Sequence, residues 1–378
     1  MTVTGKSAYH TGRRPYRRFS VFFALILSAA MILSGCGKRT GDSLKKSADE
    51  ASSMSLQTDA KKETKLPEGY YLMRVGHVQS VESPRHRSLL QFKKKVEAET
   101  DGMVIVEIHP AGELGGGTEM TDMVSSGELE CVRGGDLEYL PKSTMLGLPM
   151  IADNIEEVRK ICRSDFVQNM LRIVETDHGM KVLAVGDDGG FRQITNSVRE
   201  IRNPDDMKGL KMRTVLEVID LSMQAFGATT VTVPFTGLYD ALKDGDADGQ
   251  ENPLAVIDSN RLYEVQDYLS IIDYSFLPEL MYVNLDWWES LPEEYRTVIS
   301  DAAQEMMEIQ SSMTDEENEM YIRHIKESGC KVTVLTKEER AAFKPLAREV
   351  WQKYIENGRI SENELKQLLS VVGKKPDL

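Results

Sequence analysis

The hydrophobic pattern divides the chain into three parts. One strongly apolar run lies within the first 35 residues, and residues 36–68 are polar. From residue 69 onward, short apolar runs between turn residues alternate with stretches whose apolar residues recur every three or four positions. The short runs predict buried strands, and the three- and four-residue spacing predicts amphipathic helices. This alternation predicts an α/β layered fold with a mainly parallel sheet.

The expected strands are residues 71–77, 103–108, 129–133, 180–186, 191–195, 210–214, 229–233, 247–251, 268–273, 280–284 and 331–335. Expected helices include residues 84–100, 154–178, 238–243 and 253–264, the first capped by Ser83 with Pro84 in its first turn. Residues 293–328 lack Gly and Pro and keep helical spacing. At about 1.5 Å per residue this helix would exceed about 50 Å, which is longer than one lobe. The alternative is two helices that break near Thr314 and Asp315.

The first 35 residues read as an export signal. The basic segment RRPYRR at residues 13–18 precedes fifteen almost wholly apolar residues, 19–33. A basic start, a short apolar core and small residues define a secretory signal. The ending Leu33-Ser34-Gly35-Cys36 resembles the bacterial lipobox, which implies cleavage before Cys36 and lipidation of that residue. An uncleaved signal anchor is the alternative, although fifteen residues are short for a membrane span.

Residues 36–68 show no strand or helix pattern, and we interpret them as a disordered tether. The expected location is therefore extracytoplasmic, on the periplasmic side or the cell surface, with a lipid anchor in the membrane. The chain has 46 basic and 60 acidic residues, for a net charge of −14. So acidic a protein is a poor nucleic-acid binder, because such affinity comes mainly from Lys and Arg.

Four cysteines are present, and none forms a CxxC pair. With Cys36 assigned to lipidation, the sequence leaves open whether Cys131, Cys162 or Cys330 pair. The segment Asp244–Gly249 matches the first half of a calcium-binding EF-hand loop, but the twelfth position is Ala255 instead of Glu. No familiar hydrolase, kinase or nucleotide-binding motif occurs, so we expect no catalytic residue, no metal and no cofactor.

Three segments carry the strongest signal: GFRQITN at residues 190–196, PDDMKGLKMR at residues 204–213, and VPFTGLYDAL followed by DGQENP between residues 233 and 253. In this order and spacing they resemble the solute receptors of TRAP transporters, in the dicarboxylate-binding (DctP-like) family and its lipoprotein form. The resemblance covers most of residues 70–340.

The resemblance implies an α/β, two-lobed fold like that of periplasmic binding proteins, with a hinge and a long helix spanning both lobes. The expected division is residues 69–189 plus 278–317 for lobe I and residues 190–277 plus 318–378 for lobe II. It also implies that Arg213 pairs with the ligand carboxylate, that Arg192 is a second basic contact, that Phe235 packs on the ligand and that Asn252 hydrogen-bonds the carboxylate end.

The chemistry of arginine supports these two assignments as ligand contacts. A guanidinium binds a carboxylate through two parallel hydrogen bonds, and it is costly to bury without such a partner. Purely structural roles remain open: an ion pair of Arg192 with Glu251 or Asp188, a structural role for Arg213, and a core position for Phe235. In the first lobe, His77, Gln79, Arg133 and Asp136 are candidates to contact the far end of the ligand. The resemblance places Gly117 and Gly135 where sialic-acid-specific members have acidic residues, which argues against sialic acid.

We therefore expect an extracytoplasmic receptor that captures a small organic acid, such as a dicarboxylate or sugar acid, in an interlobe cleft. The resemblance implies delivery to integral-membrane TRAP permease subunits driven by an ion gradient, without catalysis. The alternatives are a secreted lyase or hydrolase acting on a carboxylate, or the receptor of an ATP-driven importer or a sensor. The sequence does not identify the acid.

Overall fold

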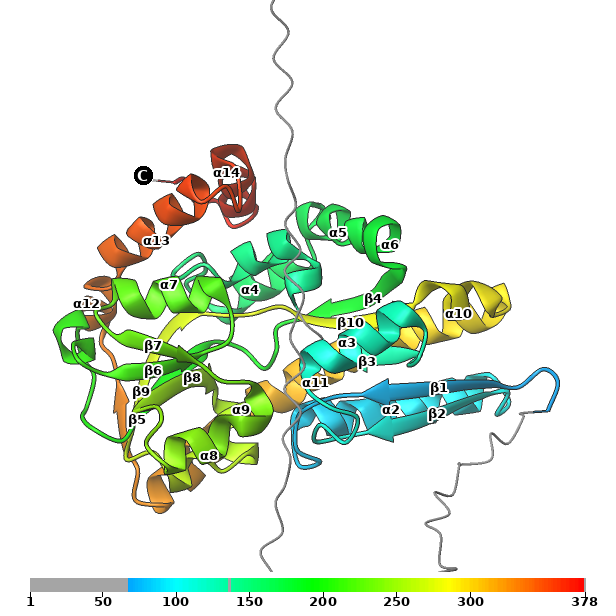
Figure 1. The fold of residues 1–378 in the computed structure, drawn as a ribbon, viewed down its shortest axis with the longest axis horizontal. Helices are drawn as coiled ribbons and strands as arrows, with labels where there is room; N and C mark the ends of the chain where they lie inside the picture. Colours follow the sequence, from blue (N-terminus) through cyan, green and yellow to red (C-terminus); the bar gives the residue numbers. More distant parts are fainter. Residues whose placement is uncertain (1–66, 135–136, 377–378) are drawn as a thin grey trace, which may run out of the picture. The chain divides into compact units, whose positions relative to one another are not determined.

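A computed structural model describes residues 67–134 and 137–376 (Figure 1). Within this part, two β-sheets form the framework of the two lobes. The first sheet contains β1 (Tyr71–Gly76), β2 (Val104–His109), β3 (Cys131–Arg133), β4 (Met180–Gly186) and β10 (Glu279–Asn284). The second contains β5 (Arg192–Asn196), β6 (Lys211–Thr214), β7 (Thr229–Thr232), β8 (Gly249–Pro253), β9 (Tyr268–Ser275) and β11 (Lys331–Val334). The strand orders are β2-β1-β3-β10-β4 and β11-β9-β5-β8-β6-β7.

Helices cover both sheets. The helices are α2 (Pro84–Glu99), α3 (Gly117–Ser126), α4 (Ile155–Cys162), α5 (Asp165–Leu171), α6 (Ile173–His178), α7 (Glu217–Ala225), α8 (Leu238–Lys243), α9 (Leu254–Ser259), α10 (Leu285–Ser290), α11 (Glu293–Glu327), α12 (Lys337–Ala341), α13 (Lys344–Glu356) and α14 (Glu362–Val371). The predicted two-lobed α/β fold is confirmed.

Each sheet is parallel except for one reversed strand, β10 in the first and β5 in the second. Both reversed strands come directly after a segment that crosses from one sheet to the other. The first crossing is residues 187–191, between β4 and β5, and the second is residues 276–278, between β9 and β10. At each crossing the chain leaves one sheet at its carboxyl edge and enters the other at its carboxyl edge, so the new strand must run backwards. The carboxyl edges of both sheets therefore lie at the crossings, where open α/β sheets bind ligands.

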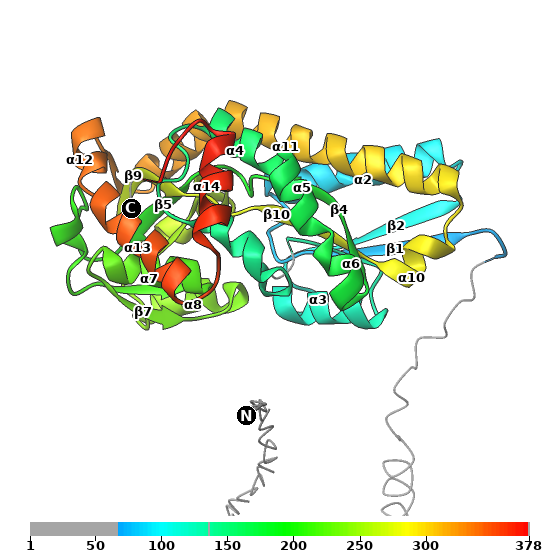
Figure 2. The same ribbon diagram turned by 90° about the horizontal axis from the view of Figure 1, so that it is seen from above.

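The long helix α11 is continuous for 35 residues, and Thr314 and Asp315 lie inside it. It packs on α2 and β4 of the first lobe and on α9 and β11 of the second. Figure 2 shows α11 running along one side of both sheets. The predicted helix that spans both lobes is therefore confirmed, and the predicted alternative with a break is wrong.

Residues 154–178, expected as one helix, form α4, α5 and α6 instead. Ser164 starts α5, because its side-chain oxygen accepts a hydrogen bond from the Val167 backbone N–H at 3.3 Å. The apolar spacing continues across this cap, so the hydrophobic pattern did not reveal it. The helix expected at residues 253–264 is also shorter than predicted. It is α9, which ends at Ser259, and Arg261 beyond it adopts a left-handed conformation with φ 51°.

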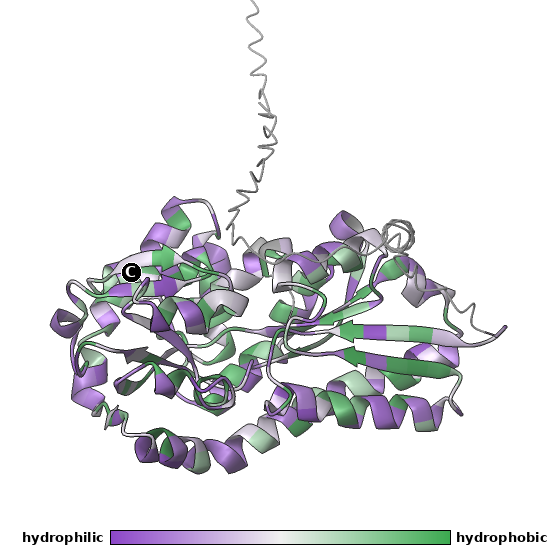
Figure 3. Ribbon diagram, turned by 60° about the horizontal axis from the view of Figure 1, so that its bottom comes forward, coloured by the Kyte–Doolittle hydropathy of each residue, from purple (hydrophilic) through white to green (hydrophobic). Residues whose placement is uncertain are grey.

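Hydrophobic residues are concentrated in the strands (Figure 3), and the buried ones among the described residues form three clusters. One cluster lies between the first sheet, α2 and α11, and another between the second sheet, α8, α9 and the end of α11. A third cluster joins residues 137–174 to α7, α13 and α14. The C-terminal helices contact both α7 and α4, so they connect segments that the predicted division assigns to different lobes. The predicted lobe boundaries stay a prediction.

The three cysteines in the described part, Cys131, Cys162 and Cys330, are buried free thiols. None of the helices there is both long enough and apolar enough to cross a bilayer. The predicted signal, Cys36 as the predicted lipidation site and nearly all of the predicted tether lie outside the described residues.

Gly249 tests the packing of the second sheet, because it opens β8 against β5. A Cβ atom there would lie 2.3 Å from the Thr195 carbonyl oxygen and 2.8 Å from Asn196 Cβ. We expect Gly249→Ala to lower the free energy of unfolding in urea by about 1–3 kcal/mol. Gly117→Ala is the control, because its new Cβ would have its nearest neighbour at 3.9 Å. Equal stability of both variants would contradict this close approach.

Candidate functional site

A cavity of about 390 Å³ lies at the facing carboxyl edges of the two sheets. Its wall comes from the segments after β1, β3, β6 and β7, from the starts of α2 and α3, and from both crossings. Five of the residues predicted as ligand contacts line it: Gln79, Arg192, Arg213, Phe235 and Asn252. His77 and Arg133 do not line it.

Arg213 projects from β6 and is only 1% exposed. Its Nε donates to the Val233 carbonyl oxygen at 2.8 Å. Its Nη2 is buried and has no hydrogen-bond partner among the described residues, and no described carboxylate lies within ion-pair distance of the head group. Burial lowers the pKa of Arg213 to about 10; the attraction of Glu251 opposes this effect and the repulsion of Arg192 adds to it. Arg213 therefore stays charged at neutral pH, and its Nη2 donors are unused among the described residues.

Arg192, in β5, makes the structural ion pair that the sequence left open. Its Nε pairs with Glu251, its Nη1 lies 3.4 Å from Asp188 Oδ2, and its Nη2 donates to Asn252 Oδ1 at 2.9 Å. Burial disfavours its charge, but Glu251 and Asp188 outweigh burial and raise its pKa. The Asn252 amide donates in turn to Gln250 Oε1 at 2.5 Å. Arg192 and Asn252 therefore line the cavity with groups already engaged by the protein.

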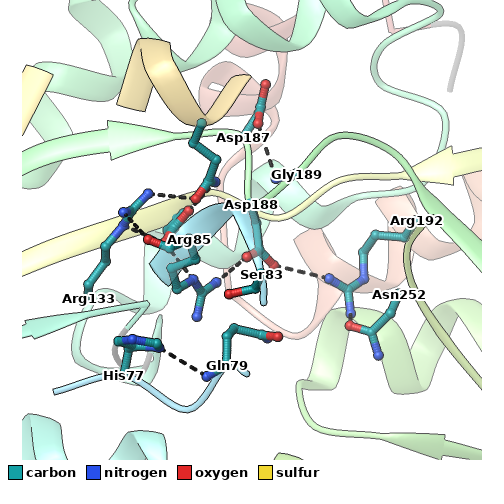
Figure 4. A network of polar contacts seen from close by, with 12 residues as sticks. His77, Gln79, Ser83, Arg85, Arg133, Asp187, Asp188, Gly189, Arg192 and Asn252 are labelled. Carbon is teal, nitrogen blue, oxygen red and sulfur yellow. Dashed lines mark hydrogen bonds and ion pairs between the residues drawn. The ribbon is translucent and has the colours of Figure 1, made fainter. Parts of the chain in front are cut away.

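Arg85, in the first turn of α2, is a cavity residue that the sequence reasoning missed. Its Nη2 pairs with Asp188 (Figure 4). Its Nε lies 2.7 Å from Glu279 Oε1. Burial lowers its pKa, but the two carboxylates outweigh burial and raise it. Its position in the sequence could have indicated a buried ion pair. The helix dipole disfavours a cation in the first turn of a helix, unless an anion lies nearby to compensate it.

Asp188 joins the two lobes electrostatically, because it contacts Arg85 of the first lobe and Arg192 of the second. It lies in the first crossing with a left-handed φ of 49°, and Gly189 follows at φ 93°. Burial raises the pKa of Asp188 to about 6; Arg85 opposes this shift, Glu279 adds to it and Arg192 opposes it. Above this pH it is charged and holds both guanidiniums.

Arg133 lies behind the cavity wall and is fully buried. Its Nε is 2.8 Å from Glu279 Oε1, and its other nitrogens donate to Ser88 Oγ at 2.7 Å and Gln310 Oε1 at 2.6 Å. The two terminal nitrogens are therefore hydrogen-bonded within the protein, whereas Nε meets Glu279 only as an ion pair. Its position supports Glu279, which lines the cavity.

His77 is also fully buried behind the wall. Its Nδ1 accepts the Gln79 backbone N–H at 3.2 Å, so in the neutral ring Nε2 carries the proton and faces His86 Nδ1 at 3.1 Å. Burial, together with Arg85, His86 and Arg133, lowers its pKa to about 2. Gln79 itself reaches the cavity.

Phe235 is half-buried in a single 3₁₀ turn, Phe235–Gly237, where it lines the cavity and also packs on the second-lobe core. Gly117 lines the cavity too, whereas Gly135 and Asp136 lie outside the described residues. Within residues 67–134 and 137–376, no cluster of His, Cys, Asp or Glu is arranged to hold a metal ion.

The buried neutral state of His77 should make the free energy of unfolding depend on pH. An unfolded histidine takes up a proton below about pH 6.5, whereas folded His77 stays neutral to about pH 2. Acid therefore favours the unfolded state, and between pH 7 and pH 5 this residue should cost about 2 kcal/mol of unfolding free energy. His77→Asn keeps an acceptor for Gln79 and should lose that much less in urea titrations at the two pH values. An unchanged dependence in His77→Asn would contradict the assignment.

Comparison with known proteins gives consistent matches. The model of the bacterial extracellular solute-binding proteins, family 7, matches residues 75–357. The C4-dicarboxylate-binding periplasmic protein DctP of Rhodobacter capsulatus is 28% identical over 291 residues, which cover 75% of this chain and 86% of that protein.

Solved structures share the fold. The sugar acid binding protein DctPAm of Advenella mimigardefordensis, in complex with galactonate, has 26% identity and a TM-score of 0.76, covering 80% of this chain and 97% of that one. A TRAP periplasmic solute binding protein of Desulfovibrio salexigens with bound orotic acid has 27% identity and a TM-score of 0.74, with 80% and 97% covered. The family match spans most of the described residues and includes strands of both sheets. The chain therefore belongs to family 7 of the bacterial extracellular solute-binding proteins, the receptors of TRAP transporters, as its sequence predicted.

Proposed function

We propose that this chain captures a small organic acid in the cavity between its sheets and delivers it to a TRAP-type membrane permease. One observation carries the proposal: Arg213 lines the cavity, and its buried Nη2 has no hydrogen-bond partner among the described residues. A buried charge needs a partner, and a carboxylate supplies a planar pair of acceptors that matches the guanidinium. The relatives named above bind dicarboxylate, galactonate and orotic acid, all of which carry carboxylates.

The remaining roles follow from position. Phe235 presents its half-buried ring to the body of the ligand, and Asn252 orients the carboxylate end beside Arg192. Gln79 reaches the ligand from the first lobe. The family consists of receptors, and we infer that the bound acid is released unchanged.

Two contacts between the lobes support a mechanism of hinge closure. Asn260 Nδ2 of the second lobe donates to Gln79 Oε1 of the first at 3.0 Å. Thr236 of the second lobe lies so near Gly112 of the first that a Cβ on this glycine would be 3.1 Å from Thr236 Cγ2. Both Gln79 and Thr236 line the cavity. We infer that the lobes separate at these contacts to admit and release the ligand, bending at the crossings.

Arg213→Ala should weaken carboxylate binding by roughly 100-fold or more, because it removes a charge-assisted bidentate partner from a buried site. The measurement is isothermal titration with galactonate, orotate and succinate, taking whichever gives the largest thermal shift with the wild type. Arg323→Ala, which changes an exposed arginine of α11, should bind like the wild type. Near-wild-type affinity in Arg213→Ala would refute the proposed function.

We also propose that Cys36 is lipidated and anchors the receptor to the cell membrane. The support is the Leu33-Ser34-Gly35-Cys36 sequence after a basic and apolar leader. The full-length chain expressed in a bacterium should incorporate labelled fatty acid and partition into detergent. Cys36→Ser should do neither, and Cys330→Ser should behave like the wild type. Labelling that persists in Cys36→Ser would contradict the anchor.

A further inference from the structure

The positive and negative charges of the side chains around the cavity do not cancel. Five charged residues line it, and two further ones pair with them from behind. The set comprises the guanidiniums of Arg85, Arg133, Arg192 and Arg213 and the carboxylates of Asp188, Glu251 and Glu279. Four positive and three negative charges leave a surplus of one positive charge, and the unpartnered cation is Arg213.

The first-lobe side of the cavity offers no second free cation among the described residues. Arg85 is its only lining cation, and Asp188 and Glu279 both bind it. These two carboxylates themselves line the cavity. A second ligand carboxylate would therefore approach two like charges and find only a guanidinium that is already paired, which is costly in a partly desolvated site.

The start of α3 also lines the cavity, and a helix N-terminus favours anions. This end, however, already carries an anion of the protein. Glu119 Oε2 accepts the Gly116 backbone N–H at 2.8 Å and places its charge at the first turn. The helix end is therefore a weak attractor for a further negative charge. The first-lobe side offers the ligand neutral groups instead, notably the Gln79 amide.

We propose that the ligand is a monoanion, with one carboxylate on Arg213 and an uncharged body, and that Asp188 and Glu279 reject dicarboxylates. This inference rests on the proposed function and narrows it to monocarboxylates. It distinguishes the chain from the C4-dicarboxylate-binding relative, although both belong to one family.

The test uses pairs of acids that differ only at the second terminus: galactonate with galactarate, gluconate with glucarate, and butyrate with succinate, together with orotate. Each is titrated calorimetrically into the wild type at pH 7.5. We expect the tightest ligand to be a monocarboxylate and its dicarboxylate partner, where the panel has one, to bind at least 30-fold more weakly. A dicarboxylate that binds tightest and depends on Arg213 would overturn this inference and leave the proposed function intact. Failure of every acid to bind would count against both.

A variant that removes one negative charge tests whether the carboxylates around the cavity cause the rejection of dicarboxylates. Asp188→Asn keeps the side-chain shape and raises the surplus to two positive charges, so discrimination within a pair should fall at least tenfold. Asp301→Asn changes an exposed carboxylate of α11 and should keep the wild-type discrimination. Should Asp188→Asn fail to fold in a thermal melt, Glu119→Gln at the exposed start of α3 should lower discrimination in the same direction. Unchanged discrimination in the folded variants would overturn the role of these carboxylates.

Discussion

One guanidinium ties together the two crossings on which the fold depends. Arg85 binds Asp188 in the first crossing through Nη2 and Glu279, just after the second crossing, through Nε. Burying these charges is expensive, and they are tolerated because each has a close partner. The same contact fixes how the carboxyl edges of the two sheets face each other, and hence the cavity between them. Arg192 and Arg133 extend the network into the second and first sheets.

The network gives the arginines different roles although they share one environment. Arg85, Arg133 and Arg192 each form an ion pair with a protein carboxylate and so shape the wall. Arg213 Nη2 makes no hydrogen bond, because the described neighbours of this side chain offer a backbone carbonyl to Nε at 2.8 Å and no carboxylate within ion-pair distance. Burial alone therefore does not distinguish these four arginines. Arg213 differs from the other three because no described carboxylate lies within ion-pair distance of it.

Much of the fold could be predicted from the sequence because it depends on local patterns. Strands such as β4 are short apolar runs, and the 35 residues of α11 lack Gly and Pro after Pro292. The break at Ser164 and the reversed strands were not predictable in this way, since they depend on a cap and on tertiary pairing. For the site, the motif led to Arg213. It did not reveal that Arg85 reaches the cavity while Arg133 lies behind it, because those positions follow from contacts with Glu279, about 150 to 190 residues away in the chain.

The uninterrupted α11 has a mechanical consequence. Both crossings are short, and the first contains Asp188 and Gly189 with left-handed backbone angles. α11 is a third connection, and its hydrogen-bonded turns continue through Thr314 without a joint. Any swing of the lobes must be taken up as gentle curvature along this rod or as sliding of one lobe on it. In the proposed hinge motion, α11 would therefore resist bending and limit how far the lobes separate.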